Sequence, residues 1–277
     1  MGGFLLNKDL IVFSDLDGTL LNHSDYSYKD ALPALNYIKD KKIPLIITTS
    51  KTRAEVEELL NELSLNEPFI VENGGGIFFP EKYRNFNLEG EKKDGYVVIK
   101  LGVDYSYIRS IFQRLKKRFP VKGFGDMSVS EISKLTDLPA EKAVLAKKRE
   151  FSEPFIIEDT SLLPELESEV SKYSLKITRG GRFYHLIGKS QDKGKAVLKT
   201  AHIFFENSWR GAKTVGIGDS ENDFPMLKVV DIPVLIKKET GEYADIHLPN
   251  LIKSTYPGSK GWNEVFFSII KRYNLIA

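Results

Sequence analysis

Two aspartates separated by a single residue directly follow an apolar run near the start of the chain. The run, residues 10–13, has the composition of a buried parallel strand, and Asp15, Asp17 and Gly18 come just after it. Gly18 is typical of a tight turn whose backbone amides approach an anion. Crowded carboxylates repel each other unless a cation lies between them, and Mg²⁺ prefers oxygen ligands. The pattern predicts metal-assisted phosphoryl chemistry at a strand tip, although it also suits a solvated turn.

A second acidic cluster follows another short apolar run near the other end of the chain. Residues 214–218 are strand-like and stop at a segment that contains Asp219 and Asp223. If the two strands are neighbours in a parallel sheet, these carboxylates face the first pair across a cleft and offer one Mg²⁺ ion a set of oxygen ligands. The same segment also has the pattern of a helix start with Ser220 as its N-cap. Both interpretations can hold together.

Hydroxyls and cations follow a third apolar run. Thr49, Ser50 and Lys51 suit phosphate oxygens, whereas Thr52, with a glutamate three residues later, predicts a capping box for the next helix. Farther along, Lys193 begins a helix. Because a lysine at a helix N-terminus opposes the helix dipole, neutralisation of a phosphate or carboxylate explains Lys193 better than capping does.

Four motifs, in this order, resemble those of the haloacid dehalogenase superfamily of phosphohydrolases. They are Asp-Leu-Asp-Gly-Thr at 15–19, Thr-Ser at 49–50, Lys193, and Gly-Asp-Ser-Glu-Asn-Asp at 218–223. Segments 48–55, 68–75 and 181–186 are similar to the mannosyl-3-phosphoglycerate phosphatase subfamily. One departure from the broader sugar-phosphatase pattern is Ser-Lys at 50–51, where many relatives have Gly-Arg. The resemblance covers most of the chain and implies an α/β fold, with a Rossmann-like parallel-sheet core and an inserted α+β cap.

The resemblance also implies a reaction and a set of site residues. It implies a Mg²⁺-dependent phosphatase that hydrolyses a glycosyl-3-phosphoglycerate, most closely the mannosyl compound, to give the compatible solute mannosylglycerate. Asp15 is then the nucleophile that forms an aspartyl phosphate, Asp17 the acid and base, and Lys193 the cation that offsets the phosphate charge. The implied metal ligands are Asp15, Asp17, Asp219 and Asp223, and the implied phosphate contacts are Gly18, Thr49, Ser50, Lys51 and Asn222.

Other functions remain open. A glucosyl-3-phosphoglycerate or a sucrose-phosphate type of substrate fits the same core motifs. A phosphomannomutase-like enzyme shares this core chemistry but transfers the phosphoryl group to a sugar hydroxyl rather than to water. A phospho-acceptor signalling module also uses an acidic Mg²⁺ pocket. Asp17, placed as an acid and base two residues after the nucleophile, argues against the signalling module.

The order of the elements predicts a core, an insertion and a return to the core. Strands are expected at 10–14, 43–49, 69–73, 212–218 and 232–236, and a closing amphipathic helix around 262–270. We expect residues 1–83 to form the first part of the core domain, 84–189 an inserted α+β cap domain, and 190–277 the second part of the core. The polar segment after Pro80 suits an exit from the core, and residues 188–192 suit the return.

The cap must supply selectivity, because the core motifs recognise only phosphate and metal. A Gly-Gly hairpin there presents Arg182 and His185, and a forked guanidinium suits the carboxylate of a glycerate. Glu72 and Asn73, at the end of a core strand, can reach sugar hydroxyls. The alternatives are a solvated hairpin, a structural histidine, and a turn that Glu72 and Asn73 only fix.

Composition restricts the class of protein further. The 277 residues carry a net charge of +2, so there is no general electrostatic case for nucleic acid or a membrane surface. The absence of cysteine excludes disulfides and thiolate metal sites. The start lacks the basic and apolar pattern of a signal peptide, and we expect a cytoplasmic protein. The partner expected is a small phosphorylated sugar-glycerate, and nothing in the sequence indicates an oligomeric state.

Overall fold

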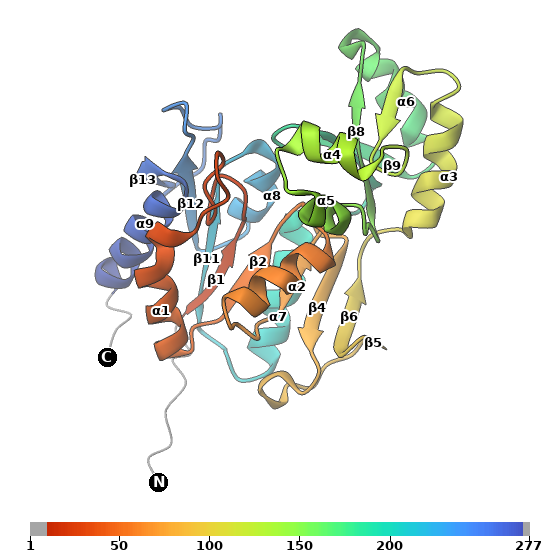
Figure 1. The fold of residues 1–277 in the computed structure, drawn as a ribbon. Coiled ribbons are helices and arrows are strands. Elements are labelled where there is room, and N and C mark those ends of the chain that lie inside the picture. The colour runs from red at the N-terminus through yellow and green to blue at the C-terminus, as the bar shows by residue number, and fades with distance from the viewer. Residues whose placement is uncertain (1–9, 274–277) are drawn as a thin grey trace.

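The computed structural model describes residues 10–273, and its strands form two sheets (Figure 1). The strands of the larger sheet are β1 (Leu10–Ser14), β2 (Leu45–Thr48), β3 (Phe69–Val71), β4 (Gly76–Pro80), β5 (Glu91–Lys93), β6 (Tyr96–Lys100), β11 (Lys213–Gly218), β12 (Ile232–Lys237) and β13 (Ile252–Pro257). Their spatial order is β13-β12-β11-β1-β2-β3-β4-β6-β5. Neighbours from β13 to β3 pair in parallel, and β4, β6 and β5 continue the sheet antiparallel. The predicted α/β parallel core is confirmed.

Helices cover both faces of this sheet (Figure 1). They are α1 (Leu32–Lys41), α2 (Arg53–Glu62) and α9 (Gly258–Arg272) on one face, and α7 (Lys193–Glu206) and α8 (Phe224–Leu227) on the other. The central strand β1 shows why: Leu10 and Val12 lie in the first core, whereas Ile11 and Phe13 lie in the second. A strand buried on both faces needs such a continuous apolar run. The closing amphipathic helix is confirmed as α9.

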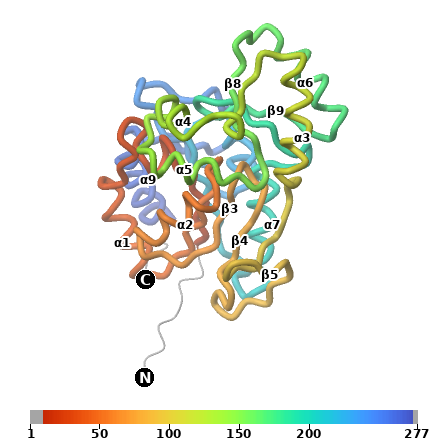
Figure 2. Tube along the Cα trace, turned by 45° about the vertical axis from the view of Figure 1, so that its right-hand side comes forward, coloured from red at the N-terminus to blue at the C-terminus, as the bar shows by residue number. Residues whose placement is uncertain are grey.

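The second sheet belongs to the cap, which lies above strands β3 and β4 of the larger sheet in Figure 2. Its antiparallel strands, in spatial order, are β7 (Val121–Gly123), β8 (Ser152–Ile157), β10 (Tyr184–Gly188) and β9 (Leu175–Arg179). The cap helices are α3 (Tyr105–Leu115), α4 (Val129–Thr136), α5 (Ala140–Ala146) and α6 (Leu163–Ser171). Helices α3 and α6 share a core with the cap sheet, while α5 contacts α2 of the core domain. The cap therefore closes over one edge of the core.

The first crossing from core to cap differs from the expected one at residue 84. Strands β5 and β6 pair with β4 in the larger sheet, so the chain leaves this sheet only after Lys100. The polar segment 80–90 joins two strands of one sheet and includes a short 3-10 helix (Tyr83–Asn85). Buried Val97 and Val98 explain the difference, because they extend the core surface of β4. The return crossing lies between β10 and α7, at residues 189–192.

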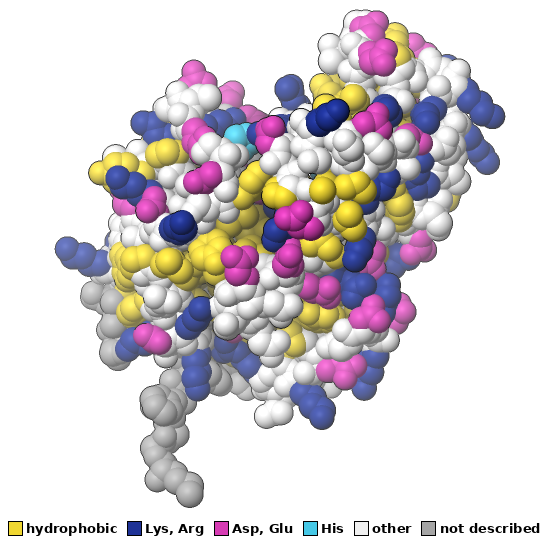
Figure 3. Space-filling view, in the orientation of Figure 1, with side chains coloured by type: hydrophobic (Ala, Val, Ile, Leu, Met, Phe, Trp, Pro, Cys, Tyr) yellow, Lys and Arg dark blue, Asp and Glu magenta, His cyan; other side chains and the backbone are white. Residues whose placement is uncertain are grey.

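Two further observations concern the surface and the ends. None of the helices within residues 10–273 is long and apolar enough to span a membrane. The face seen in Figure 3 carries acidic and basic side chains interspersed over both domains.

Residues 1–9 and 274–277, and with them the start considered above for a signal peptide, lie outside the described residues. Other short 3-10 helices are Lys29–Ala31, Thr160–Leu162 and Glu221–Asp223.

Candidate active site

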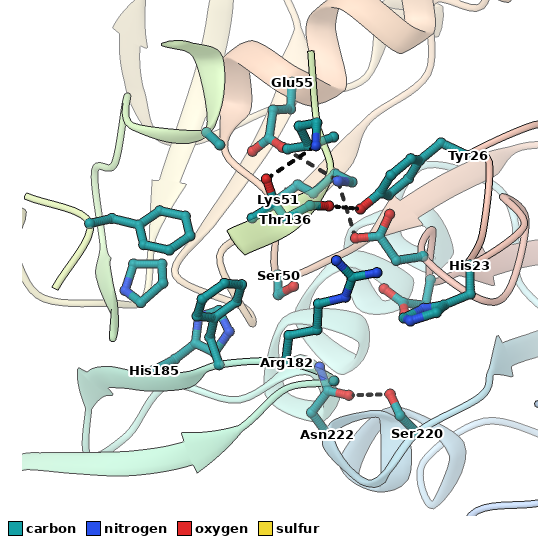
Figure 4. Close-up of a pocket in the computed structure, with 18 of the residues that line it drawn as sticks. His23, Tyr26, Ser50, Lys51, Glu55, Thr136, Arg182, His185, Ser220 and Asn222 are labelled. Atoms are coloured by element: carbon teal, nitrogen blue, oxygen red, sulfur yellow. Dashed lines mark hydrogen bonds and ion pairs between the residues drawn. The ribbon is translucent and has the colours of Figure 1, made fainter. Parts of the chain in front are cut away.

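The four motif segments converge at the carboxyl ends of β1, β2 and β11, beneath the cap. Parallel pairing brings them together: the amide of Asp15 donates to the carbonyl of Ile217, and that of Asn73 to the carbonyl of Thr49, both at 2.9 Å. A pocket opens there between core and cap (Figure 4). The residues predicted from the sequence that line it are Asp15, Asp17, Ser50, Lys51, Arg182, His185, Asp219 and Asn222.

Three carboxylates at the base of the site offer oxygen atoms to one point. Asp15, Asp219 and Asp223 each present an oxygen within 4.8 Å of the others, and all three are nearly or fully buried. Gly18 permits this approach. Its φ is +74°, and a Cβ added there would lie only 2.6 Å from an oxygen of Asp219. Thr19 orients the same residue, because its hydroxyl donates to Asp219 Oδ1 at 3.2 Å. The cluster has the oxygen chemistry of a divalent-cation site.

The electrostatics of the cluster support that interpretation. Burial and the nearby charge of Asp223 raise the pKa of Asp15 to about 7, although Lys193 opposes the shift. Burial, Asp223 and Asp15 likewise raise the pKa of Asp219 well above its usual value. Lys193 Nζ lies 2.8 Å from Asp15 Oδ1 and 2.6 Å from Asp223 Oδ1. One lysine cannot neutralise three carboxylates, so a divalent cation fits the remaining charge.

Asp17 lies outside this cluster and has a different environment. Its Oδ2 is 3.1 Å from Lys51 Nζ, and Lys51 also pairs with Glu55 at 3.4 Å. Burial lowers the pKa of Lys51, but the charges of Asp17 and Glu55 outweigh burial and raise it, so Lys51 stays cationic. Oδ1 of Asp17 is buried and has no hydrogen-bond partner among the described residues. This oxygen is therefore not engaged by another described residue.

The predicted phosphate-binding residues divide into pocket-facing and supporting ones. Ser50 and Asn222 face the pocket in Figure 4, whereas Thr49 is buried and its hydroxyl accepts the amide of Lys51 at 3.2 Å. Asn222 is oriented from two sides, because Asn73 Oδ1 accepts from its amide at 3.2 Å and the Ser220 hydroxyl donates to its Oδ1 at 2.7 Å.

Both predicted caps are present beside these groups. Thr52 and Glu55 form a capping box at the start of α2, and Ser220 and Asp223 form one at the 3-10 helix Glu221–Asp223. Asp223 therefore serves as a cap and as a member of the acidic cluster. The helix start and the acidic cluster predicted for residues 219–223 are therefore both present.

Glu72 does not reach the pocket. It is fully buried, and its carboxylate accepts the amides of Glu150 at 2.7 Å and Phe151 at 3.0 Å. It also accepts the hydroxyl of Ser152 at 2.6 Å and lies 3.2 Å from the guanidinium of Arg149. With every acceptor directed at the loop before β8, Glu72 joins core to cap. The structure gives no support for the predicted contact of Glu72 with sugar hydroxyls, because Glu72 is fully buried, does not line the pocket, and uses both carboxylate oxygens within the protein.

The hairpin between β9 and β10 carries Arg182 and His185 to the pocket, and both point into it in Figure 4. Arg182 is partly exposed, and its Nη1 donates to Asp137 at 2.7 Å. His185 is buried, and its Nδ1 has no partner among the described residues. Burial and the charges of Arg149 and Lys193 lower the pKa of His185 to about 3, so the imidazole is neutral. It can hydrogen-bond hydroxyls, but it supplies no charge.

Sequence reasoning missed several residues of the pocket wall. Tyr26 donates its hydroxyl to the carbonyl of Thr136 at 2.9 Å, which ties a core loop to the cap, and Lys51 lies over its ring. Arg149 also lines the pocket. Tyr26 lies in a polar loop and Arg149 in a basic run, and neither context carries a periodic signal. The left-handed φ of Tyr26, +56°, is equally invisible in the sequence.

The raised pKa of Asp15 predicts a pH-dependent metal effect. Between its usual pKa of 3.8 and its folded value of about 7, the folded chain holds more protons than the unfolded chain. Without metal, the free energy of unfolding should therefore fall as pH rises through this window. Mg²⁺ binds the deprotonated cluster, so it should raise Tm more at about pH 8 than at about pH 5. Calorimetry with and without Mg²⁺ at both pH values measures this increase in Tm. The Asp219→Asn variant should lose most of the increase. Equal shifts at both pH values contradict it.

Comparison with known proteins places the chain in a family. A protein family described as "haloacid dehalogenase-like hydrolase" matches residues 12–244 of this chain. A glucosyl-3-phosphoglycerate/mannosyl-3-phosphoglycerate phosphatase from Persephonella marina is 55% identical over 261 residues, which are 94% of this chain and 97% of the relative. A protein of the same name from Methanococcoides burtonii is 41% identical over 96% of this chain and 99% of the relative.

Solved structures agree on the fold. A protein from Thermoplasma acidophilum aligns with a TM-score of 0.67 at 18% identity, over 97% of this chain and 99% of that one. A sucrose-phosphatase from Synechocystis, solved with sucrose and phosphate, aligns with a TM-score of 0.61 at 16% identity, over 97% of this chain and 99% of that one. At these sequence identities, the similarity to solved structures establishes the fold alone. With the family match over most of its length and a closely similar relative, this chain belongs to the haloacid dehalogenase-like hydrolases.

Proposed function

We propose that this chain is a Mg²⁺-dependent phosphatase that hydrolyses glycosyl-3-phosphoglycerates, with either mannose or glucose as the sugar, through an aspartyl-phosphate intermediate. The relatives at 55% and 41% identity are named for both sugars, which widens the mannosyl substrate expected from the sequence. The products are then a glycosylglycerate and phosphate. Mannosylglycerate synthesis and a cytoplasmic location belong to the same proposal.

One observation carries the chemistry: two aspartates, two residues apart, lie in opposite environments. Asp15 is buried in the acidic cluster and paired with Lys193, whereas Asp17 lines the pocket and keeps one oxygen without a hydrogen-bond partner among the described residues. A nucleophile needs its charge held and its direction fixed, and an acid and base needs a free oxygen at the substrate. The pair therefore divides the two roles of a phosphatase that works through a covalent intermediate.

In the first step Asp15 attacks phosphorus, and the bond to the leaving oxygen breaks. Asp17 Oδ1 donates a proton to that oxygen, so the glycosylglycerate leaves as an alcohol. Ser50 and Asn222 are placed to hold phosphate oxygens, and Lys193 offsets the charge that gathers on them. In the second step Asp17 takes a proton from water, and the resulting hydroxide attacks the aspartyl phosphate. The bond between phosphorus and Asp15 breaks, which regenerates the carboxylate of Asp15 and releases inorganic phosphate.

Asp15, Asp219 and Asp223 would hold Mg²⁺ with the backbone carbonyl of Asp17, directly or through water. When bound, the ion supplies positive charge at the phosphate and relieves the repulsion that raises the pKa of Asp15. Nucleophilic attack and proton transfer are carried out by the side chains of Asp15 and Asp17. The hydrogen bond from Tyr26 to Thr136 holds the cap against a core loop, and this contact would help to exclude bulk water while the acyl phosphate exists.

A phosphate-release panel tests the function. With Mg²⁺ present, mannosyl- and glucosyl-3-phosphoglycerate should each exceed mannose phosphate, sucrose phosphate and 3-phosphoglycerate in kcat/KM by at least about tenfold. A run in ¹⁸O-labelled water should place solvent oxygen in the phosphate released. Preference for a plain sugar phosphate would move the assignment to another sugar phosphatase. Transfer to a sugar hydroxyl without label uptake would make the chain a phosphomutase.

A further inference from the structure

Arg149 is the most firmly held cation of the cap at the pocket. It follows α5, is almost fully buried, and lines the same pocket as Asp15 and Asp17. Its Nη2 donates to the carbonyl of Ser50 at 2.8 Å and to the Ser152 hydroxyl at 2.6 Å. Its Nε lies 3.2 Å from Glu72 Oε2. These contacts fix the plane of the guanidinium on the pocket wall.

One edge of this guanidinium is left over. Arginine has five N–H donors, and the hydrogen bonds of Arg149 to described residues come from Nη2 alone. Nε is buried and contacts Glu72 as an ion pair without a hydrogen bond, and Nη1 donates to no described residue. Glu72 does not depend on Arg149 alone, because it also accepts the amides of Glu150 and Phe151 and the hydroxyl of Ser152. The arginine can therefore bind a second carboxylate without losing the first.

The other two cap residues at the pocket fit this role less well. His185 is neutral, as its lowered pKa shows, and offers no charge to an anion. Arg182 is partly exposed on the hairpin, and its Nη1 already pairs with Asp137, a largely exposed residue. A rim ion pair of this kind is flexible and screened by solvent. A preorganised donor loses less entropy on binding a ligand, so Arg149 is the stronger anion site.

The position along the substrate also agrees. In a 3-phosphoglycerate the carboxyl carbon and the phosphate-bearing carbon are attached to the same central carbon, so the carboxylate must be bound close to the phosphate. Ser50 lines the phosphate end of the pocket, and Arg149 is bonded directly to its carbonyl. We propose that Arg149, held by Glu72, Ser50 and Ser152, binds the carboxylate of the glycerate unit and sets the preference for this substrate class. This rests on the proposed function and replaces Arg182 in the role expected from the sequence.

The test compares two substrates that differ in one group. One is 2-O-glucosyl-3-phosphoglycerate, and the other is its glucosylglycerol phosphate counterpart, in which a hydroxymethyl group replaces the carboxylate. The selectivity is the ratio of their kcat/KM values. Arg149→Met should lower this ratio on the order of 10²-fold, since a charge-assisted contact from Nη1 is lost. Arg182→Ala is the matched control and should change the ratio by less than about threefold, in keeping with a rim contact.

Loss of Arg149 leaves Glu72 as a buried carboxylate without its ion-pair partner, which can unfold the protein. The double variant Glu72→Gln/Arg149→Met removes both charges and should fold with a Tm close to that of the wild type. Its ratio should stay as low as that of Arg149→Met. A purely structural role of Arg149 predicts instead that the repaired double variant regains the wild-type ratio, and that outcome overturns the inference.

The remaining outcomes are equally decisive. Equal losses on both substrates, with the ratio unchanged, or a selective loss in Arg182→Ala alone also overturn the role of Arg149. The wild type separates this inference from the proposed function. If the wild type does not prefer the carboxylate-bearing substrate, the proposed function itself fails. If it does, and Arg149→Met keeps that preference, only the inference fails.

Discussion

Asp15→Asn should lower kcat by about 10⁴-fold or more, because an amide cannot attack phosphorus and the covalent route is lost. The fold should survive. Burial disfavours the charge of Asp15 and raises its pKa to about 7, so a neutral amide of the same shape suits this position. Tm without metal should stay equal to that of the wild type or rise. Steady-state phosphate release and calorimetry on the same preparation measure both effects.

Asp245→Asn is the matched control for this prediction. It makes the same chemical change at a side chain that is 91% exposed, and it should leave kcat within about twofold. A trapping experiment adds a direct readout: acid quench of the wild type should give a phosphorylated chain, and that of Asp15→Asn none. Near-normal turnover in a folded Asp15→Asn protein, or a phosphoenzyme that still forms in it, contradicts the assignment of the nucleophile.

The core of the site was accessible from the sequence because its information is local. Three of the four motifs follow an apolar run that forms a parallel strand, and parallel strands bring their carboxyl ends to one edge. Asp15, Asp219 and Asp223 are therefore brought together by sheet order alone. Lys193 was visible for another local reason: a cation at a helix start is unfavourable unless an anion faces it, and Asp15 and Asp223 do so.

The parts that the sequence misplaced depend on contacts between distant segments. Glu72 follows a core strand, which suggested contact with a ligand, yet residues 149–152 fold back and contact both oxygens of its carboxylate. Arg149 stands in a run of basic residues that is ordinary on a surface, and only the buried Glu72 reveals its role. The domain boundary expected at residue 84 also differs from the structure, where β5 and β6 still belong to the core sheet. The polar loop between two strands of this sheet has the composition of a linker, so the sequence alone does not distinguish the two.

Asp17→Asn should lower kcat for a glycosyl-3-phosphoglycerate on the order of 10³-fold, while KM changes by less than about threefold. The amide keeps the shape of the side chain but cannot give or take a proton. Asp17 lines the pocket and its Oδ1 has no hydrogen-bond partner among the described residues, so we expect this oxygen to transfer the proton. The salt bridge of Oδ2 to Lys51 is also lost, but Lys51 keeps Glu55 and stays in place.

The leaving group separates the two duties of Asp17. With p-nitrophenyl phosphate the first step needs little proton donation, because nitrophenolate is stable as an anion. Asp17→Asn should then release nitrophenol in a rapid burst and accumulate the aspartyl phosphate on Asp15, since only the attack of water still needs a base. Rapid-quench measurement should show a burst that approaches one equivalent per active site. Without a burst, and with both substrates slowed alike, Asp17 would support the phosphate pocket through Lys51 rather than transfer protons.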